Sequence, residues 1–569
     1  MASRPTLKAG VASADLWYRY THYLWMLTLA GLIATGVGAR LVLFLSDRGV
    51  THDEGLLYLA LQRWSPKGWF TPLGFEQTAG PLYLAILHAL AKTGPHAEYI
   101  YRLVSLFASL FILPVVYISV KILRPGRSAL IATTLLALHS GLIIYTGFFK
   151  QYETDAFATA FIFGLAAFIK IRGKESGTWW IVLVSGCLCV FLSQPSMIIL
   201  ACLLIWAFLA PELRRTRRWI VPCLLAWATL AGICYLYSYA PIASSPYMRS
   251  FWADSYLSIG TIRGWRNVSD SLFGASAGGV IPGFVLAFLA IAAMIIRRDW
   301  ASFILGGCPI VTTTILAILH FYPVAPRLWM FLSPPVAYAS AVGAEFVVTK
   351  LAQGLPGHHG RVAAVVLVPI LAAGFLQAHN RLHITSAFPA IRALRGSRTR
   401  ERGREDVAAL LRSKSCDPIY VAARSVPTWY FYTSLEPQDN NNRYFLLQSI
   451  WRRDSPAFGD AAPSVLHLPD PAPQLVLRVG CREEVYGLAS GTPNRNGLPP
   501  QGRVPVAGWA QNELDRMSAL GTSRFLLDLE DTGAFESEAL LSELSRRHLH
   551  YRTLDPAFPL YEVQKDYSR

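Results

Sequence analysis

Charged residues are scarce in this chain of 569 residues, making up only 15% of the total. A soluble globular domain carries about 25%, so the sequence lacks the side chains that would cover a water-exposed surface of this size. Hydrophobic residues make up 53% of the chain, and its mean hydropathy is +0.35. The composition excludes a single soluble domain, a disordered chain and a fibrous repeat, and it predicts a membrane protein.

Positive charge is in excess, with 52 Lys and Arg against 36 Asp and Glu. Residues 1–380 hold 28 of the basic and 14 of the acidic residues, a net charge of +14, whereas residues 381–569 hold 24 and 22, a net charge of +2. Nearly all long apolar runs also lie in the first part. The excess therefore belongs to a membrane part with basic cytoplasmic loops, and a nucleic-acid partner is not expected.

Apolar runs of roughly 20 residues, the length that crosses a bilayer, recur through the first part. Eleven spans are predicted, at 23–46, 102–121, 128–148, 156–170, 178–194, 197–211, 219–240, 278–296, 301–321, 328–349 and 362–379. With a cytoplasmic N-terminus, five alternating loops hold 14 basic against three acidic residues, as the positive-inside rule requires of cytoplasmic loops. The apolar run Pro81–Leu90 is too short to span and would invert this pattern, so we predict an interfacial helix there.

The predicted fold is a polytopic α-helical membrane module over residues 1–380, followed by an extracytoplasmic α/β domain over residues 381–569. We expect an integral protein of the bacterial cytoplasmic (inner) membrane. Cys416 and Cys481 lie in the outer domain, where an oxidising compartment would permit a disulfide, and two buried thiols are the alternative. The aromatic run Pro427–Tyr432 could bind glycan, but packing between the domain and the membrane module is favoured.

Two adjacent carboxylates, Asp53 and Glu54, directly follow the first predicted span. Such a pair at the membrane surface is costly unless the groups are solvated, paired or functional. The structural interpretation is that Asp53 caps the next helix and Glu54 complements its dipole. The functional interpretation gains weight from charged residues that are expected at the same face.

Those further charges come from three other segments. Lys150, Glu153 and Asp155 lie where the third span reaches the outer face, and Lys150 could simply pair with Glu153 at i,i+3. Arg102 and Arg327 open the second and tenth spans, where an Arg could also snorkel to lipid headgroups. Cations and carboxylates converging on one face favour a site for an anionic headgroup and a base, because Arg suits phosphate.

These segments resemble the polyprenyl-phosphate-sugar-dependent glycosyltransferases of the membrane GT-C fold. That family includes protein O-mannosyltransferases and the enzymes that put aminoarabinose on lipid A. The resemblance lies in the Asp53-Glu54 pair, Gly80-Pro81-Leu82, Arg102-Leu103, Lys150-x-Tyr152-x-x-Asp155 and Tyr322-Pro323-x-x-x-Arg327. It covers roughly residues 20–350 and implies sugar transfer from a polyprenyl-phosphate donor to a glycan, lipid or protein acceptor, among membrane lipids.

The resemblance also implies a role for each residue. Asp53 would be the base, Glu54 would support it or help bind a divalent cation, and Asp155 would position the acceptor or a cation. The donor phosphate would be held by Arg102, Lys150, Tyr152 and Arg327, and the acceptor or sugar would contact His52, Tyr322 and Trp252. No cofactor is certain. The carboxylates would suit Mg²⁺ or Mn²⁺, but the sequence indicates no ligand set.

The loop of residues 240–274, which contains Trp252, is polar and aromatic. It could close over substrate, although an interfacial helix with a Trp/Tyr belt is favoured. A transporter or flippase of a lipid-linked saccharide is the alternative function, and a non-catalytic scaffold is a third. A transporter is expected to show ionisable residues near mid-bilayer and two matching halves. The charges are instead expected to collect at the outer face, and no internal repeat is visible, which favours the enzyme.

Overall fold

The computed structural model describes residues 6–45, 50–64, 69–73, 77–92, 98–244, 248–249, 252–273 and 290–354, together with strands, a helix and single residues between 419 and 564. The predicted span 362–379, most of the predicted span 278–296, the boundary at residue 380 and both Cys416 and Cys481 lie outside the described residues. The proposed disulfide therefore stays a prediction.

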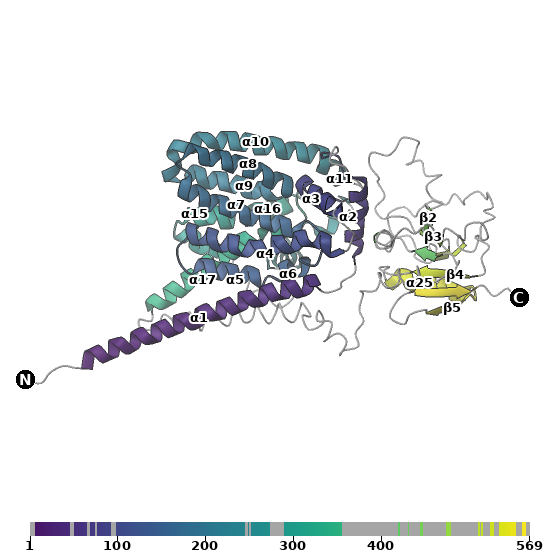
Figure 1. Cartoon of the computed structure of the whole chain (residues 1–569), viewed down its shortest axis with the longest axis horizontal. Coiled ribbons are helices and arrows are strands. Elements are labelled where there is room, and N and C mark those ends of the chain that lie inside the picture. Colours follow the sequence, from purple (N-terminus) through teal and green to yellow (C-terminus); the bar gives the residue numbers. More distant parts are fainter. Residues whose placement is uncertain are drawn as a thin grey trace, which may run out of the picture.

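The N-terminal part is a bundle of helices (Figure 1). Its helices are α1 (Thr6–Leu45), α2 (His52–Arg63), α3 (Pro81–Ala91), α4 (Glu98–Leu123), α5 (Ser128–Ala137), α6 (Ser140–Tyr145), α7 (Tyr152–Arg172), α8 (Ser176–Leu192), α9 (Ser196–Leu209), α10 (Ile220–Cys234), α11 (Ala240–Ala243), α13 (Ile262–Phe273), α15 (Trp300–Ser302), α16 (Cys308–Ile318) and α17 (Ser333–Gly354). Short 3₁₀ or π turns join several of them. The π turn Tyr235–Tyr239 joins α10 to α11, and the π turn Phe303–Gly307 joins α15 to α16.

Five described helical segments are long and apolar enough to cross a membrane, which supports membrane integration. They are Met26–Leu45, Glu98–Leu123, Tyr152–Arg172, Pro211–Ala243 and Trp300–Ile318, and all five coincide with predicted spans. The predicted span 128–148 is instead divided between α5 and α6, because the helix breaks at Leu138 and His139. The short apolar run after Gly80 forms the 11-residue helix α3, and its interfacial position stays a prediction.

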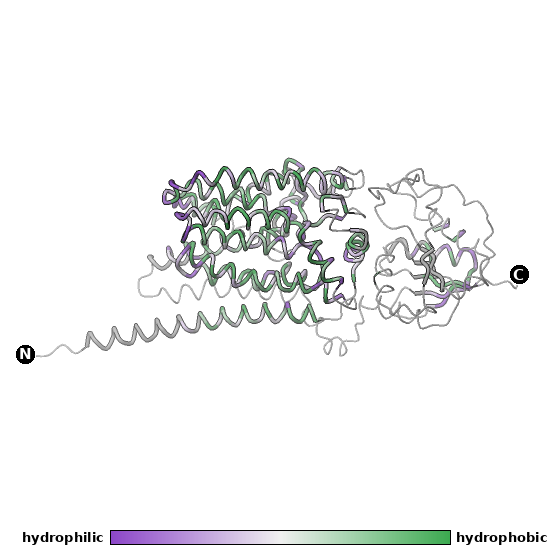
Figure 2. The backbone as a smooth tube through the Cα atoms, turned by 45° about the horizontal axis from the view of Figure 1, so that its top comes forward, coloured by the Kyte–Doolittle hydropathy of each residue, from purple (hydrophilic) through white to green (hydrophobic). Residues whose placement is uncertain are grey.

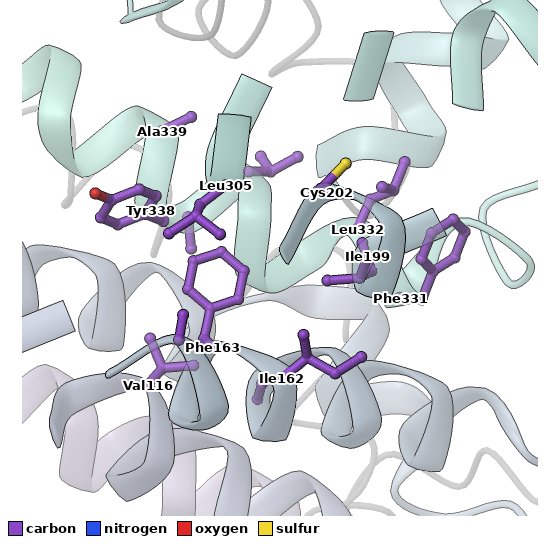
Figure 3. Packing of buried hydrophobic residues seen from close by; sticks show 14 of the residues in the cluster. Val116, Ile162, Phe163, Ile199, Cys202, Leu305, Phe331, Leu332, Tyr338 and Ala339 are labelled. Carbon is purple, nitrogen blue, oxygen red and sulfur yellow. The ribbon is translucent and has the colours of Figure 1, made fainter. Parts of the chain in front are cut away.

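One hydrophobic core runs along the bundle between α4, α7, α9 and α17. Phe163 of α7 lies at its centre, with its ring centroid 5.5 Å from that of Tyr338 on α17. Figure 3 shows Phe163 between Val116 of α4 and Tyr338, with Leu305 beside them. The hydrophobic residues extend along the helices and the hydrophilic residues gather at the ends (Figure 2), as a membrane-spanning bundle requires.

Several basic loops meet at one end of the bundle. Arg124 pairs with Asp299 at 2.5 Å and with Glu345 at 3.2 Å, joining the α4–α5 turn to α15 and α17. At the same end, Lys170 donates a hydrogen bond to the carbonyl oxygen of Leu123 at 2.7 Å. The loops predicted to share one side therefore do lie together, and the assignment of that side to the cytoplasm stays a prediction.

The described C-terminal residues form a six-stranded sheet of order β2-β3-β1-β4-β6-β5. The strands are β1 (Ile419–Val421), β2 (Tyr444–Leu447), β3 (Gln474–Arg478), β4 (Arg524–Asp528), β5 (His550–Thr553) and β6 (Leu560–Gln564). Strands β1 and β4 are parallel, and the other neighbours are antiparallel. The helix α25 (Ala534–Arg546) packs on the apolar side chains Phe525 and Leu527. The sheet and α25 lie within the residues for which an α/β domain was predicted.

Candidate functional site

The N-terminus of α2 is held by a capping box. Thr51 Oγ1 accepts a hydrogen bond from the Glu54 backbone N–H, and Glu54 Oε2 accepts one from the Thr51 backbone N–H at 2.9 Å. This motif satisfies backbone groups that a helix start leaves unpaired. The N-cap is therefore Thr51, which corrects the structural interpretation of Asp53 as the cap and leaves the Asp53 carboxylate available for other contacts.

Glu54 is the buried centre of the site. Its side chain is 0% exposed and accepts from Arg102 Nε at 3.3 Å, from Arg102 Nη2 at 3.4 Å and from the Phe149 backbone N–H at 3.0 Å. A buried carboxylate needs such charge-assisted hydrogen bonds to remain ionised. Arg102 is itself only 2% exposed, so it pairs with a carboxylate inside the protein and does not snorkel. Glu54 thus ties α2 to α4 and to the segment that precedes α7.

Asp53 points to a different partner. Its Oδ2 accepts from Arg327 Nη1 at 2.7 Å, and the two side chains are 42% and 29% exposed. The Arg327 guanidinium also lies 5.6 Å from the centre of the Trp252 ring, within the range of a cation–π contact. The fold therefore brings together three predicted site residues from distant segments, and it leaves the Asp53–Arg327 pair accessible to a ligand.

Lys150 lies next to this pair and is 5% exposed. Its Nζ donates to Oε1 of Gln77 at 2.6 Å. Burial is the main cause that lowers the pKa of Lys150 to about 8; the nearby Arg327 charge acts in the same direction, and the charges of Asp53 and Glu54 oppose it. The alternative pair of Lys150 with Glu153 is not formed, because neither carboxylate oxygen of Glu153 has a hydrogen-bond partner among the described residues.

The remaining predicted residues surround this group at varying distances. Asp155 is buried in the first turn of α7, close to both Tyr152 and Tyr322. Tyr152 also lies close to the charged groups of Asp53 and Arg327. The hydroxyl of Tyr322 donates to the carbonyl oxygen of Leu328 at 3.0 Å, in the segment that carries Arg327. The side chain of His52 lies outside the described residues.

One face of α4 carries polar residues that sequence reasoning missed. Ser105 donates to the carbonyl oxygen of Lys150 at 3.3 Å, and Ser109 donates to that of Leu142 at 3.2 Å. Together with Arg102 they repeat at i, i+3 and i+7, the spacing of one helix face. Ser105 and Ser109 hold the segment between α5 and α7 at two heights, Arg102 binds Glu54 of α2, and the spacing of the three residues was readable in the sequence.

Arg40 is a second buried polar residue that the sequence did not single out. Its position corrects the expectation that the charges collect at the outer face. It lies within the span Met26–Leu45, is 0% exposed and donates to Ser109 Oγ at 2.8 Å and to the carbonyl oxygen of Leu136 at 2.8 Å. It therefore closes the C-terminal end of α5, where free carbonyl groups favour a cation. Glu153, in the first turn of α7, is also fully buried and interacts electrostatically with Arg40.

The loop of residues 240–274 forms in part the amphipathic helix α13, with Val268 and Leu272 buried and Ile262 exposed. The helix has one packed and one exposed face, and its place at the membrane interface stays a prediction. Among the described residues, no group of three or more His, Cys, Asp or Glu side chains is placed to hold a metal ion. The expected divalent cation therefore has no ligand set in this part of the chain.

Solved structures of membrane enzymes resemble this fold. ArnT from Cupriavidus metallidurans bound to undecaprenyl phosphate is 13% identical, with 72% of this chain and 84% of that chain covered and a TM-score of 0.40. The oligosaccharyltransferase AglB from Archaeoglobus fulgidus, in complex with an inhibitory peptide and a dolichol-phosphate, is 13% identical, with 95% and 74% covered and a TM-score of 0.48. An A. fulgidus oligosaccharyltransferase complex with Zn and sulfate is 15% identical, covers 72% of this chain and 58% of that chain, and has a TM-score of 0.42.

No protein-family model matches the sequence, and a search of curated proteins returns no match. At identities of 13–15%, the structural likeness does not by itself assign an activity to this chain. The activity has to be inferred from the site.

Proposed function

We propose that this protein transfers a sugar from a polyprenyl-phosphate donor to an acceptor hydroxyl on the extracytoplasmic face of the membrane. The observation that carries the proposal is the accessible pair of Asp53 and Arg327, joined at 2.7 Å beside the buried Lys150. Displacing a lipid phosphate from a sugar needs a carboxylate for the incoming hydroxyl and cations for the leaving charge. This pair supplies both within one contact.

The ion pair suggests how the donor and the base are coupled. An incoming phosphate competes with Asp53 for the guanidinium of Arg327, because planar Arg donors bind phosphate oxygens in bidentate fashion. When Arg327 turns to the phosphate, Asp53 loses its partner and can accept the proton of the acceptor hydroxyl. The ammonium group of Lys150 then stabilises the same phosphate with a second positive charge. The ligands of the similar structures, undecaprenyl phosphate and a dolichol-phosphate, are consistent with a donor of this chemistry.

The other residues act as supports in this scheme. Glu54 and Arg102 hold the start of α2 and the backbone of Phe149, so Arg102 positions the site and does not contact the phosphate. Trp252 stacks near Arg327, and Asp155 with Tyr322 forms the side on which an acceptor glycan, lipid or protein hydroxyl would bind. His52, at the start of α2, is assigned the acceptor contact that the family resemblance implies.

Transbilayer movement of a lipid-linked saccharide is the second candidate. Arg40 and Glu153 favour it, because ionisable residues buried within membrane spans are frequent in transport pathways. Arg40, however, uses its donors on Ser109, Gly36, Leu136 and Ala137, which ties it to the protein interior. This commitment favours a structural role for Arg40 and leaves the enzyme as the first choice.

The test is sugar transfer by purified protein from radiolabelled polyprenyl-phosphate sugars to a panel of acceptors. Asp53→Asn should lose most of the transfer, about 10²–10⁴-fold, while inserting normally. Asp299→Asn is a matched control, since it also breaks an Asp–Arg pair, with Arg124, but at the opposite end of the bundle. Full transfer by Asp53→Asn would refute the assignment of the base. Transbilayer movement without transfer in the wild type would favour the transporter.

A further inference from the structure

Phe431 belongs to the C-terminal part of the chain, but its ring packs among aromatic side chains of the helix bundle. Its ring centroid lies 4.9 Å from that of Tyr58, 6.0 Å from that of Phe149 and 6.2 Å from that of Tyr101. These distances fall in the range of attractive aromatic pairs, and the Phe149 contact is stacked. Phe431 is 0% exposed, so these contacts bury the whole side chain.

Strand β4 places a second residue from the same part of the chain in this cluster. Leu526 is 6% exposed and belongs to the hydrophobic cluster that contains Phe431, Tyr58 and Phe149. Its neighbours Phe525 and Leu527 belong to a different cluster, the one beneath α25. Successive side chains of a strand point to opposite faces of the sheet. One face of the sheet is therefore covered by α25, and Leu526 on the other face belongs to the cluster that includes side chains of α2.

Each aromatic residue that Phe431 touches adjoins a charged residue of the site. Tyr58 lies one helical turn after Glu54 on the same face of α2. Tyr101 immediately precedes Arg102, and Phe149 immediately precedes Lys150. The backbone N–H of Phe149 also donates to Glu54 at 3.0 Å. Phe431 thus packs against the same three segments that Glu54 joins by hydrogen bonds.

We propose that the contact of Phe431 with Tyr58, Tyr101 and Phe149, here termed the Phe431 latch, docks the C-terminal sheet onto the bundle and positions Glu54 and Lys150 for reaction. Phe431 is a positioning residue in this scheme, because it acts through Phe149 and Tyr58 and touches no reacting group. The docking stands on the contacts alone, whereas its effect on catalysis rests on the proposed sugar transfer.

The docking is tested without any activity, by hydrogen–deuterium exchange of the full-length protein. Phe431→Ala should raise exchange of the Phe149 amide and of the first turn of α2 by about tenfold, because the opening of these segments no longer has to break the latch. Phe525→Ala is the matched control, since it truncates an equally buried phenylalanine on the opposite face of the sheet. Equal exchange at Phe149 in the wild type and in Phe431→Ala, or equal increases in both variants, would overturn the docking.

The effect on catalysis is tested by a double-mutant cycle. Phe431→Ala and Tyr58→Ala should each lower kcat by about 10-fold to 100-fold, as small displacements of reacting groups do. The double variant should lose no more than the stronger single one, because both remove the same contact. Phe431→Leu, which retains apolar volume, should recover most of kcat. Additive losses, or no loss in Phe431→Ala, would overturn the positioning role.

The pH profile separates positioning from simple loss of folded enzyme. Lys150 faces Asp53 and Glu54 from α2, Arg327 from the segment before α17, and Gln77. Loss of the latch should let water enter beside Phe149 and reduce the burial of Lys150. The pH at which transfer declines should then rise above about 8 in Phe431→Ala. A smaller folded fraction would lower the rate but leave that pH unchanged. An unchanged pH of decline would overturn the positioning role. Absence of transfer in the wild type would refute the proposed function but leave the exchange result decisive for docking.

Discussion

Arg327 donates to Asp53 across 274 residues of sequence, with 2.7 Å between Nη1 and Oδ2. Both side chains remain partly exposed, so the pair is accessible to a ligand in a way that the fully buried Glu54–Arg102 pair is not. The two adjacent carboxylates of α2 therefore have different environments and different partners. Asp53 faces the site, and Glu54 holds the segments around it.

Arg327 should not be replaceable by lysine. Arg327→Lys keeps the charge but loses the planar fork that can bind two phosphate oxygens, so we expect transfer to fall about tenfold or more with the loss mainly in the KM for the donor. Arg327→Gln should lose more. The measurement is steady-state transfer at varied donor concentration. The conservative change Arg124→Lys, in the ion pair at the opposite end, should leave donor KM unchanged, and an equal effect there would contradict the role of Arg327.

Transfer should decline as the pH rises through about 8. The proposed phosphate contact needs protonated Lys150, and burial lowers the pKa of this group to about 8 from a usual value of 10.5. The unfolded chain binds the proton more tightly, so between pH 8 and 10.5 the same shift makes the free energy of unfolding rise with pH. A rate profile and a thermal-unfolding series over this range check both signs. Loss of transfer that tracks loss of folded protein would contradict the role of Lys150.

Gln77 should set the position of that alkaline limb. Its Oε1 accepts from the Lys150 Nζ at 2.6 Å, a hydrogen bond that favours the charged form. In Gln77→Leu the buried ammonium loses this partner, so we expect the limb to move below pH 8, with activity near neutral pH affected least. Gln151→Leu serves as a control, because the Gln151 side chain donates to the carbonyl oxygen of Thr78 in the same segment and does not contact Lys150. Equal shifts in the two variants would argue for a general loosening of this segment.

The sequence was sufficient to predict much of the bundle and part of the site, for a physical reason. Membrane insertion depends on the local length of an apolar run and on the charge of the loops beside it. Spans such as Glu98–Leu123 and Tyr152–Arg172 could therefore be predicted within a few residues. Asp53, Lys150 and Arg327 were expected together because all three lie at span ends on one predicted side. Those inferences require only the length and order of segments.

Other features depend on which side chains meet across the bundle, and these were not predicted. Arg40 was hidden within an apolar span, and only its contacts with Ser109 and the end of α5 show why a buried cation is stable there. Gln77 has no distinguishing pattern, since its role depends on the approach of Lys150 from 73 residues away. The break of the span 128–148 at His139 likewise follows from packing and from the Arg40 cap, not from a helix-breaking residue.

Removing one partner of the buried Glu54–Arg102 pair should destabilise the protein more than any change at Asp53. Glu54→Ala leaves Arg102 charged and buried and removes the acceptor of the Phe149 N–H, so we expect a loss of about 3–5 kcal/mol in unfolding free energy. Asp53→Asn breaks a partly exposed pair, which is worth about 1 kcal/mol or less. Thermal unfolding in the same detergent compares the two. We expect Asp53→Asn to abolish transfer at nearly wild-type stability and Glu54→Ala to lower the unfolding free energy. This result would identify Asp53 as the reacting group and Glu54 as a structural support. Equal destabilisation by both would contradict that division.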